Sequence, residues 1–216
     1  MKPLDAYGDL QRFGRPVVTT DDAAVRLRVT TSAASKFLAR LQAAGLVVRL
    51  RRGLWLLAPK LDPLAFSDYL TAPFPSYISF HTALSLHGMV SQIPQVIYVA
   101  SLARTGLIRT TRGAYSIHHL APEYFGGFEI KEPSGIKLAT PEKALVDVLY
   151  LSRARSRLFS RLPELELTPK FDEDAAWSWV ARIPAPRQRT MVARRLEAAL
   201  AGTHGLRRTR KRKYDV

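Results

Sequence analysis

The chain has 216 residues, a net charge of +15 and no cysteine, so disulfides, thiolate metal sites and cysteine catalysis are excluded. A hydrophobic fraction of 47% is sufficient for a packed core, and global disorder is not expected. A strongly positive protein attracts polyanions, of which nucleic acid is the commonest. The simplest alternative is a basic soluble protein without a nucleic-acid partner.

The positive charge is concentrated at the two ends of the sequence. Residues 1–60 contain 11 Lys and Arg against 4 Asp and Glu, and residues 171–216 contain 11 against 5. The middle, residues 61–170, contains 11 against 9 and is nearly neutral. No apolar run reaches the roughly 18 residues of a membrane span, and the N-terminus lacks the apolar segment of a signal peptide. We therefore expect a cytoplasmic protein that does not contact membranes.

The first sixty residues predict three helices followed by two strands. Thr20 is expected to cap the second helix, Thr31 or Ser32 the third, and Gly45 to end it. After Gly45 the apolar period changes to that of strands, with a basic turn at Arg51-Arg52-Gly53. The expected elements are helices over residues 4–13, 20–28 and 32–44, and strands over residues 46–50 and 54–57.

This order of elements is typical of a winged helix-turn-helix DNA-binding domain, which we place at residues 1–60. Ala34, Phe37, Leu38 and Leu41 form the inward stripe of the third helix, which makes it the recognition helix. Its expected DNA-contacting residues are Thr31, Ser32, Ser35, Lys36 and Arg40. The expected wing contacts are Arg49, Arg51 and Arg52. The alternative is a basic structural domain, or a winged helix that binds protein.

The remainder predicts a connection over residues 61–75 with one short helix at 64–70, then an α+β domain over 76–204. Its expected elements are helices over 80–87, 141–151, 173–182 and 186–201 and strands over 94–100, 114–120, 127–131 and 135–139. Ser79 is expected to cap the first of these helices. Residues 205–216 predict a disordered basic tail, which either binds phosphates without reading sequence or is merely solvated. The cations of the tail are Arg207, Arg208, Arg210, Lys211, Arg212 and Lys213.

Two stretches of the middle region carry a family resemblance: the segment from Ser79 to Gly88, followed by Gln92-Ile93-Pro94, and the segment from Ala139 to Tyr150. Together they resemble the AbiEi family of bacterial type IV antitoxins. The likeness covers roughly residues 5–155, and the winged helix comes first, as in that family. The resemblance implies a protein that represses its own operon by binding double-stranded DNA, usually at inverted repeats. It also implies that the second domain counteracts a partner nucleotidyltransferase toxin, in many members without a stable complex.

Within the second stretch, Lys143 and Asp147 are candidates for antitoxin function, because helix formation alone does not require their charges. An internal salt bridge that only stabilises the domain is the competing explanation. A stand-alone winged-helix regulator with a sensor domain is the alternative function. A third possibility is a metal-dependent nucleic-acid enzyme using Glu123, Glu129 and Lys131, against which an exposed strand edge is the simpler explanation. The histidine spacing indicates no metal site, and we expect no catalytic residue and no cofactor.

Overall fold

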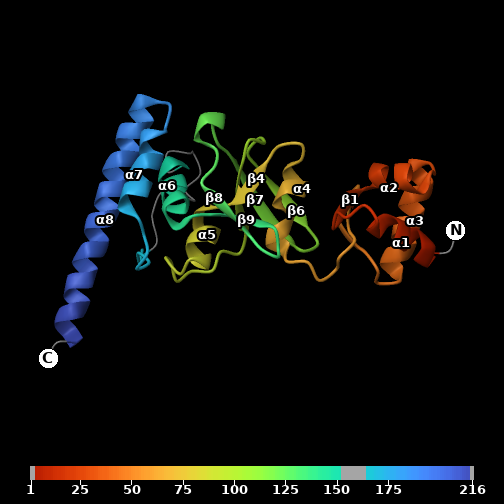
Figure 1. The fold of residues 1–216 in the computed structure, drawn as a ribbon, viewed down its shortest axis with the longest axis horizontal. Helices are drawn as coiled ribbons and strands as arrows, with labels where there is room; N and C mark the ends of the chain where they lie inside the picture. Colours follow the sequence, from red (N-terminus) through yellow and green to blue (C-terminus); the bar gives the residue numbers. More distant parts are fainter. Residues whose placement is uncertain (1–2, 152–163, 215–216) are drawn as a thin grey trace.

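The computed structural model of the protein describes residues 3–151 and 164–214, with the side chains of residues 5–151 and 164–202. The fold is α+β, as predicted, and elongated (Figure 1). The helices of the N-terminal region lie at one end of the long axis, and the last helix, α8 (Pro186–Tyr214), lies at the other. Within the described parts of the chain, no helix combines the length and apolarity that crossing a membrane requires.

The N-terminal region contains three helices packed on a small antiparallel sheet with strand order β1-β3-β2. The helices are α1 (Pro3–Gln11), α2 (Thr20–Leu27) and α3 (Thr31–Ala43), and the strands are β1 (Val17–Thr19), β2 (Val48–Arg51) and β3 (Leu54–Leu56). The three predicted helices and two predicted strands are confirmed, with ends shifted by a few residues. The sequence did not predict β1, because three residues are too few to show an alternating pattern.

Both helix caps lie one or two residues before the predicted ones. Thr19, not Thr20, caps α2: its hydroxyl accepts from the Asp22 N–H, and the Asp22 carboxylate accepts from the Thr19 N–H. Thr30 caps α3 through a 3.2 Å hydrogen bond from the Ala33 N–H to its hydroxyl. The neighbouring hydroxyl of Thr31 is therefore not used as a cap and donates to Asp21 instead.

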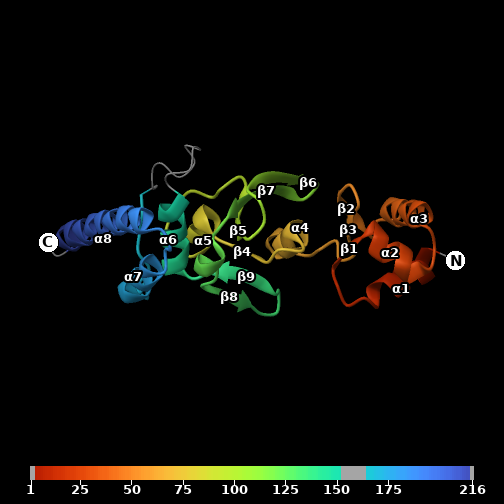
Figure 2. The same ribbon diagram turned by 90° about the horizontal axis from the view of Figure 1, so that it is seen from above.

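The rest of the chain is built on a six-stranded mixed sheet with order β6-β7-β5-β4-β9-β8. Helices α5 and α6 contact each other, and α6 also contacts α7 and α8 (Figure 2). The strands are β4 (Ser76–Ile78), β5 (Ile97–Ser101), β6 (Gly106–Thr110), β7 (Gly113–His119), β8 (Phe128–Lys131) and β9 (Ile136–Ala139). The helices are α5 (Phe80–Leu86), α6 (Pro141–Leu151) and α7 (Glu173–Ala181), followed by α8. Strands β4 and β6 were not predicted.

Helix α8 is longer than predicted. It continues through Gly202 and Gly205 to Tyr214, so the prediction of a disordered tail from residue 205 is wrong as far as Tyr214. A glycine inside a helix costs about 1 kcal/mol relative to alanine, but no proline follows to stop the helix. Arginine and lysine, which dominate this stretch, have high helix propensity.

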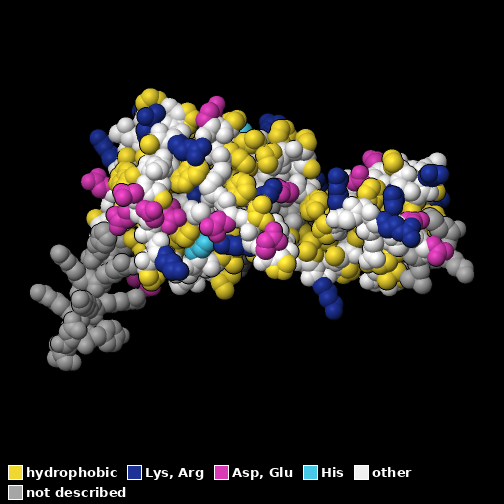
Figure 3. Space-filling model, viewed as in Figure 1, with side chains coloured by type: hydrophobic (Ala, Val, Ile, Leu, Met, Phe, Trp, Pro, Cys, Tyr) yellow, Lys and Arg dark blue, Asp and Glu magenta, His cyan; other side chains and the backbone are white. Residues whose placement is uncertain are grey.

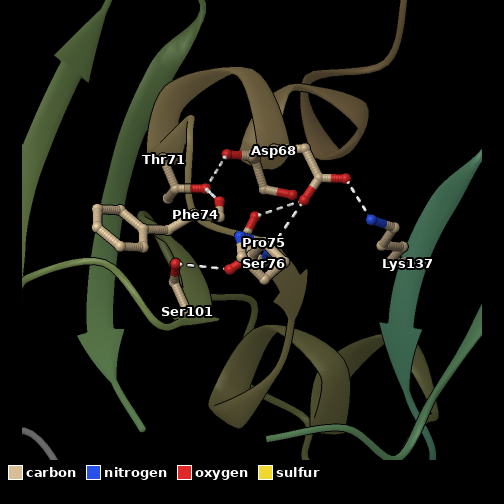
Figure 4. Close-up of polar contacts among 8 residues, drawn as sticks. Asp68, Thr71, Phe74, Pro75, Ser76, Ser101 and Lys137 are labelled. Carbon is tan, nitrogen blue, oxygen red and sulfur yellow. Dashed lines mark hydrogen bonds and ion pairs between the residues drawn. The ribbon is translucent and has the colours of Figure 1, made fainter. Parts of the chain in front are cut away.

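The segment predicted as a connection is a packed part of the second region. It folds into the 3-10 helix η1 (Pro63–Phe66) and helix α4 (Ser67–Thr71), and Phe66 and Leu70 are buried. Asp68 accepts hydrogen bonds from the Ser76 backbone and hydroxyl and pairs with Lys137 at 2.7 Å (Figure 4). These contacts tie α4 to β4 and β9, so residues 61–75 do not form a free linker.

The central strand of the small N-terminal sheet, β3, is buried on both faces. Along β3 and into the residue that follows it, successive side chains point to opposite faces of the sheet. Trp55 and Leu57 pack against the three N-terminal helices. Leu54 and Leu56 join the core of the six-stranded region instead, together with Val17 and Leu50. The two regions therefore share an apolar interface, and cutting the chain near Lys60 would expose it.

Candidate nucleic-acid interface

The outer face of α3 carries the predicted DNA-contacting residues. Ala34, Leu38 and Leu41 are fully buried, and Phe37 is partly buried, so the predicted inward stripe is confirmed. Five side chains on the other faces are exposed: Thr31, Ser32, Ser35, Lys36 and Arg40. The face that points away from the core thus presents small hydroxyl groups near the start of the helix and two cations further along.

An open pocket of about 510 Å³ lies between α3 and the hairpin formed by β2 and β3. Thr31, Ser32, Ser35 and Lys36 line it from α3, and Arg49 and Arg52 line it from the β2–β3 hairpin. The fold therefore brings six of the eight residues predicted on these two elements to one hollow. Small hydroxyl groups together with cations are groups that bind phosphate oxygens and base edges.

Four further residues line this pocket that the sequence did not predict as part of the site: Thr20, Asp21, Gly53 and Trp55. The Trp55 indole N–H donates to the Thr20 hydroxyl at 3.0 Å, and the Arg49 guanidinium lies 5.5 Å above the Trp55 ring. The Thr31 hydroxyl donates to the Asp21 carboxylate at 3.1 Å. These contacts fix the floor of the pocket and link α2, α3 and the β2–β3 hairpin.

The other predicted contacts lie outside the pocket. Arg51 is exposed on β2, and the exposed Arg40 guanidinium lies 5.9 Å from the Phe37 ring. The six basic side chains of the tail, Arg207, Arg208, Arg210, Lys211, Arg212 and Lys213, lie outside the described side chains. On the face drawn in Figure 3, acidic side chains gather over the α6–α8 end of the molecule. On that face, therefore, basic side chains do not form one continuous surface from the N-terminal region to the α6–α8 end.

The β2–β3 hairpin is held from the second region by the turn between β6 and β7. The Thr111 N–H donates to the Leu50 carbonyl at 3.0 Å, and its hydroxyl donates to the Arg49 carbonyl at 2.8 Å. Arg112 donates to the Pro59 carbonyl at 2.9 Å. No pattern in the sequence indicates this contact, because it joins segments about sixty residues apart.

No model of a protein family matches this sequence, and a search of the curated proteins finds no match either. The resemblance to AbiEi antitoxins therefore rests on its two sequence stretches, which the structure places mainly on α5 and α6.

The two candidate antitoxin residues, Lys143 and Asp147, form a fully buried ion pair. They lie one turn apart on α6, and the Nζ of Lys143 contacts Oδ1 of Asp147. The Oδ2 atom accepts hydrogen bonds from the Tyr77 hydroxyl at 3.0 Å and the Ser79 hydroxyl at 2.6 Å. The internal salt bridge is thus confirmed, and neither charge can touch a partner in this conformation. The prediction that Ser79 caps α5 with its side chain is wrong: its hydroxyl makes no cap hydrogen bond and donates to Asp147 instead.

Aromatic rings enclose the Lys143 ammonium group. Its Nζ lies 3.7 Å from the ring centre of Tyr124 and 4.9 Å from that of Trp179. Burial lowers the pKa of Lys143, and the Asp147 carboxylate opposes this shift. Gly127 has a φ of +76°, and a Cβ there would lie 2.5 Å from the Trp179 ring. The ion pair and its surrounding rings are therefore closely packed, and they join α6 to α7 and β4.

The residues considered for metal-dependent chemistry lie apart or pair with each other. Glu129 and Lys131 form an exposed ion pair at 2.6 Å on β8, which is an edge strand of its sheet. Glu123 lies in the 3-10 helix η2 (Pro122–Tyr124). Among the residues that the structure describes, no three His, Asp or Glu side chains are grouped as metal ligands would be.

Because His118 is buried, we expect the folded protein to lose stability as the pH is lowered. Burial, and to a lesser extent the nearby His81, lower the pKa of His118 from 6.5 to about 4. Below pH 6.5 the unfolded chain gains a proton that the folded chain does not, so stability is highest above pH 6.5 and falls towards pH 4. We expect the free energy of unfolding to be about 2 kcal/mol lower at pH 5 than at pH 7 through this group.

Urea unfolding of the wild type and of His118→Gln at both pH values measures this contribution. The glutamine amide can replace the 2.9 Å contact of the His118 Nε2 with the Ser116 hydroxyl but does not titrate. The variant should therefore lose less stability on acidification than the wild type. An equal loss in both proteins would contradict the assignment to His118.

Proposed function

We propose that this protein is a winged helix-turn-helix repressor of its own operon and the antitoxin of a type IV toxin–antitoxin system. In this proposal α3 is the recognition helix in the major groove, and the β2–β3 hairpin is the wing on the DNA backbone. The observation that carries the DNA-binding part is the pocket between these two elements, which six of the predicted contact residues line. The antitoxin part is supported by the resemblance of the segments around α5 and α6.

The arrangement of charge supports double-stranded DNA as the partner. The predicted contacts on α3 and the β2–β3 hairpin include the cations Lys36, Arg40, Arg49, Arg51 and Arg52. The Asp21 carboxylate, which also lines the pocket, accepts a hydrogen bond from Thr31 and is outnumbered by these cations. Their neutralisation of phosphates would release counterions, so binding should weaken steeply as salt increases. The hydroxyl groups of Ser32 and Ser35 are short enough to allow close approach of the helix to base edges.

Growth of cells that express a nucleotidyltransferase encoded next to this gene tests the antitoxin part. We expect co-expression of the full-length protein to restore growth, whereas a frameshifted copy of its gene should not. The DNA-binding part is tested on a duplex from the region upstream of the operon. We expect at least a thousandfold preference over random DNA, typical of specific binders at physiological salt.

The two parts of the proposal can fail separately. Specific DNA binding without protection of growth would leave the stand-alone regulator as the function. Protection without specific binding would contradict repression of the operon.

A further inference from the structure

We propose that Thr111, in the second region of the chain, is a positioning residue for DNA binding by the β2–β3 hairpin. This inference rests on the proposed DNA-binding function. Thr111 contacts the hairpin but is not one of the residues that line the pocket beside α3. It acts through the backbone of β2, and thereby sets the direction of the hairpin arginines.

The position of Thr111 makes it a partner for an otherwise open strand edge. β2 is the edge strand of its sheet, so the carbonyl groups on its outer side have no neighbouring strand. Thr111 supplies two hydrogen-bond donors there, its N–H to Leu50 and its hydroxyl to Arg49. In Figure 2, the β6–β7 hairpin, β2 and α3 lie along the same side of the molecule.

The contacted residues lie where β2 is irregular. Arg49 pairs with Trp55 and Arg51 pairs with Leu54, so Leu50 is an extra residue, and the strand has a bulge there. A bulge bends its strand and redirects the side chains on either side of it. Because Thr111 binds both Arg49 and Leu50, it fixes the backbone at the point that aims Arg49 and Arg51.

The two neighbours of Thr111 make different contacts from its own. Arg112 reaches the Pro59 carbonyl, so the turn between β6 and β7 also contacts the chain beyond β3. The Thr110 hydroxyl instead donates to Gly113 within its own hairpin at 2.9 Å. The Thr110 hydroxyl also accepts from the Arg112 N–H at 3.1 Å, so both of its hydrogen bonds stay within the β6–β7 hairpin, whereas the Thr111 hydroxyl bonds the β2–β3 hairpin.

The experiment measures binding of the full-length protein to a fluorescent duplex from the upstream region, by anisotropy at several salt concentrations. Thr111→Val removes the hydroxyl at nearly constant shape and should weaken binding about fivefold, the effect of one net hydrogen bond. It should also make the salt dependence shallower, because phosphate contacts of the β2–β3 hairpin are lost. Thr111→Ser keeps the hydroxyl and should bind as the wild type does, and Thr110→Val is the matched control.

A double-mutant cycle separates positioning from general stabilisation. In the Arg49→Ala/Arg51→Ala background the hairpin has lost the two side chains that Thr111 is proposed to aim, so Thr111→Val should have little or no further effect. An additional fivefold loss there would overturn the proposal, and so would wild-type affinity of Thr111→Val in the native background. If replacing the hairpin arginines weakens binding to the upstream duplex but Thr111→Val does not, the DNA-binding function stands and this inference fails. If the wild type shows no preference for the upstream duplex, both fail.

Discussion

Replacing Lys36 and Arg40 together by alanine is expected to abolish specific binding to the operator duplex. Both side chains are exposed on α3 outside its buried stripe. Each lost base contact costs about 1–3 kcal/mol, so the pair should cost about 2–6 kcal/mol if the effects add. That corresponds to a loss of roughly thirtyfold to twenty-thousandfold in affinity, measured by anisotropy at fixed salt.

A matched control removes the same charge elsewhere. Lys131→Ala/Lys170→Ala also takes away two exposed cations, but from the second region of the chain. It should lower affinity for all DNA slightly and keep the preference for the operator. The thermal unfolding of both double variants should be close to that of the wild type, because exposed substitutions rarely change stability by more than about 0.5 kcal/mol. Unchanged operator affinity of Lys36→Ala/Arg40→Ala would contradict the assignment of α3 as the recognition helix.

Replacing Asp147 by asparagine is expected to destabilise the second region severely. Asparagine keeps the size of the side chain but leaves the buried Lys143 ammonium without a counter-charge. Breaking a buried ion pair in this way costs about 3–5 kcal/mol. In a protein of this size the melting temperature should therefore fall by roughly 6–20 °C, which calorimetry or circular dichroism would measure.

Two further variants show whether the uncompensated charge is the cause. Lys143→Met in combination with Asp147→Asn removes both charges and should recover part of the lost stability. Lys131→Met breaks the exposed pair with Glu129 and should change stability by less than about 1 kcal/mol. A melting temperature of Asp147→Asn equal to that of the wild type would contradict a structural role of the pair.

The same variants address antitoxin function. If Asp147→Asn loses both stability and protection against the toxin, the ion pair acts through the structure of the second region. Loss of protection at an unchanged melting temperature would instead assign the pair a direct role. The burial of both side chains leads us to expect the first outcome.

Local patterns predicted much of the N-terminal region correctly. The apolar spacing of Ala34, Leu38 and Leu41 identified the buried face of α3, and hence which residues point outward. The change of period after Gly45 located β2 and β3. The exact caps were missed because Thr19, Thr20, Thr30, Thr31 and Ser32 offer the same capping chemistry at neighbouring positions. Only the backbone geometry selects one hydroxyl among them.

The sequence by itself determined the fold class, the concentration of charge at its two ends and the exposed face of α3, because these depend on composition and on contacts a few residues apart. Only the tertiary structure decided what joins the regions. It placed Leu54 and Leu56 in a shared core, set Tyr77 and Ser79 against Asp147, and set Thr111 against β2. The hydrogen bonds of Tyr77 and Ser79 with Asp147 and of Thr111 with Arg49 join residues that lie sixty or more positions apart. Such pairings depend on how whole elements pack, and no local pattern of residue types encodes them.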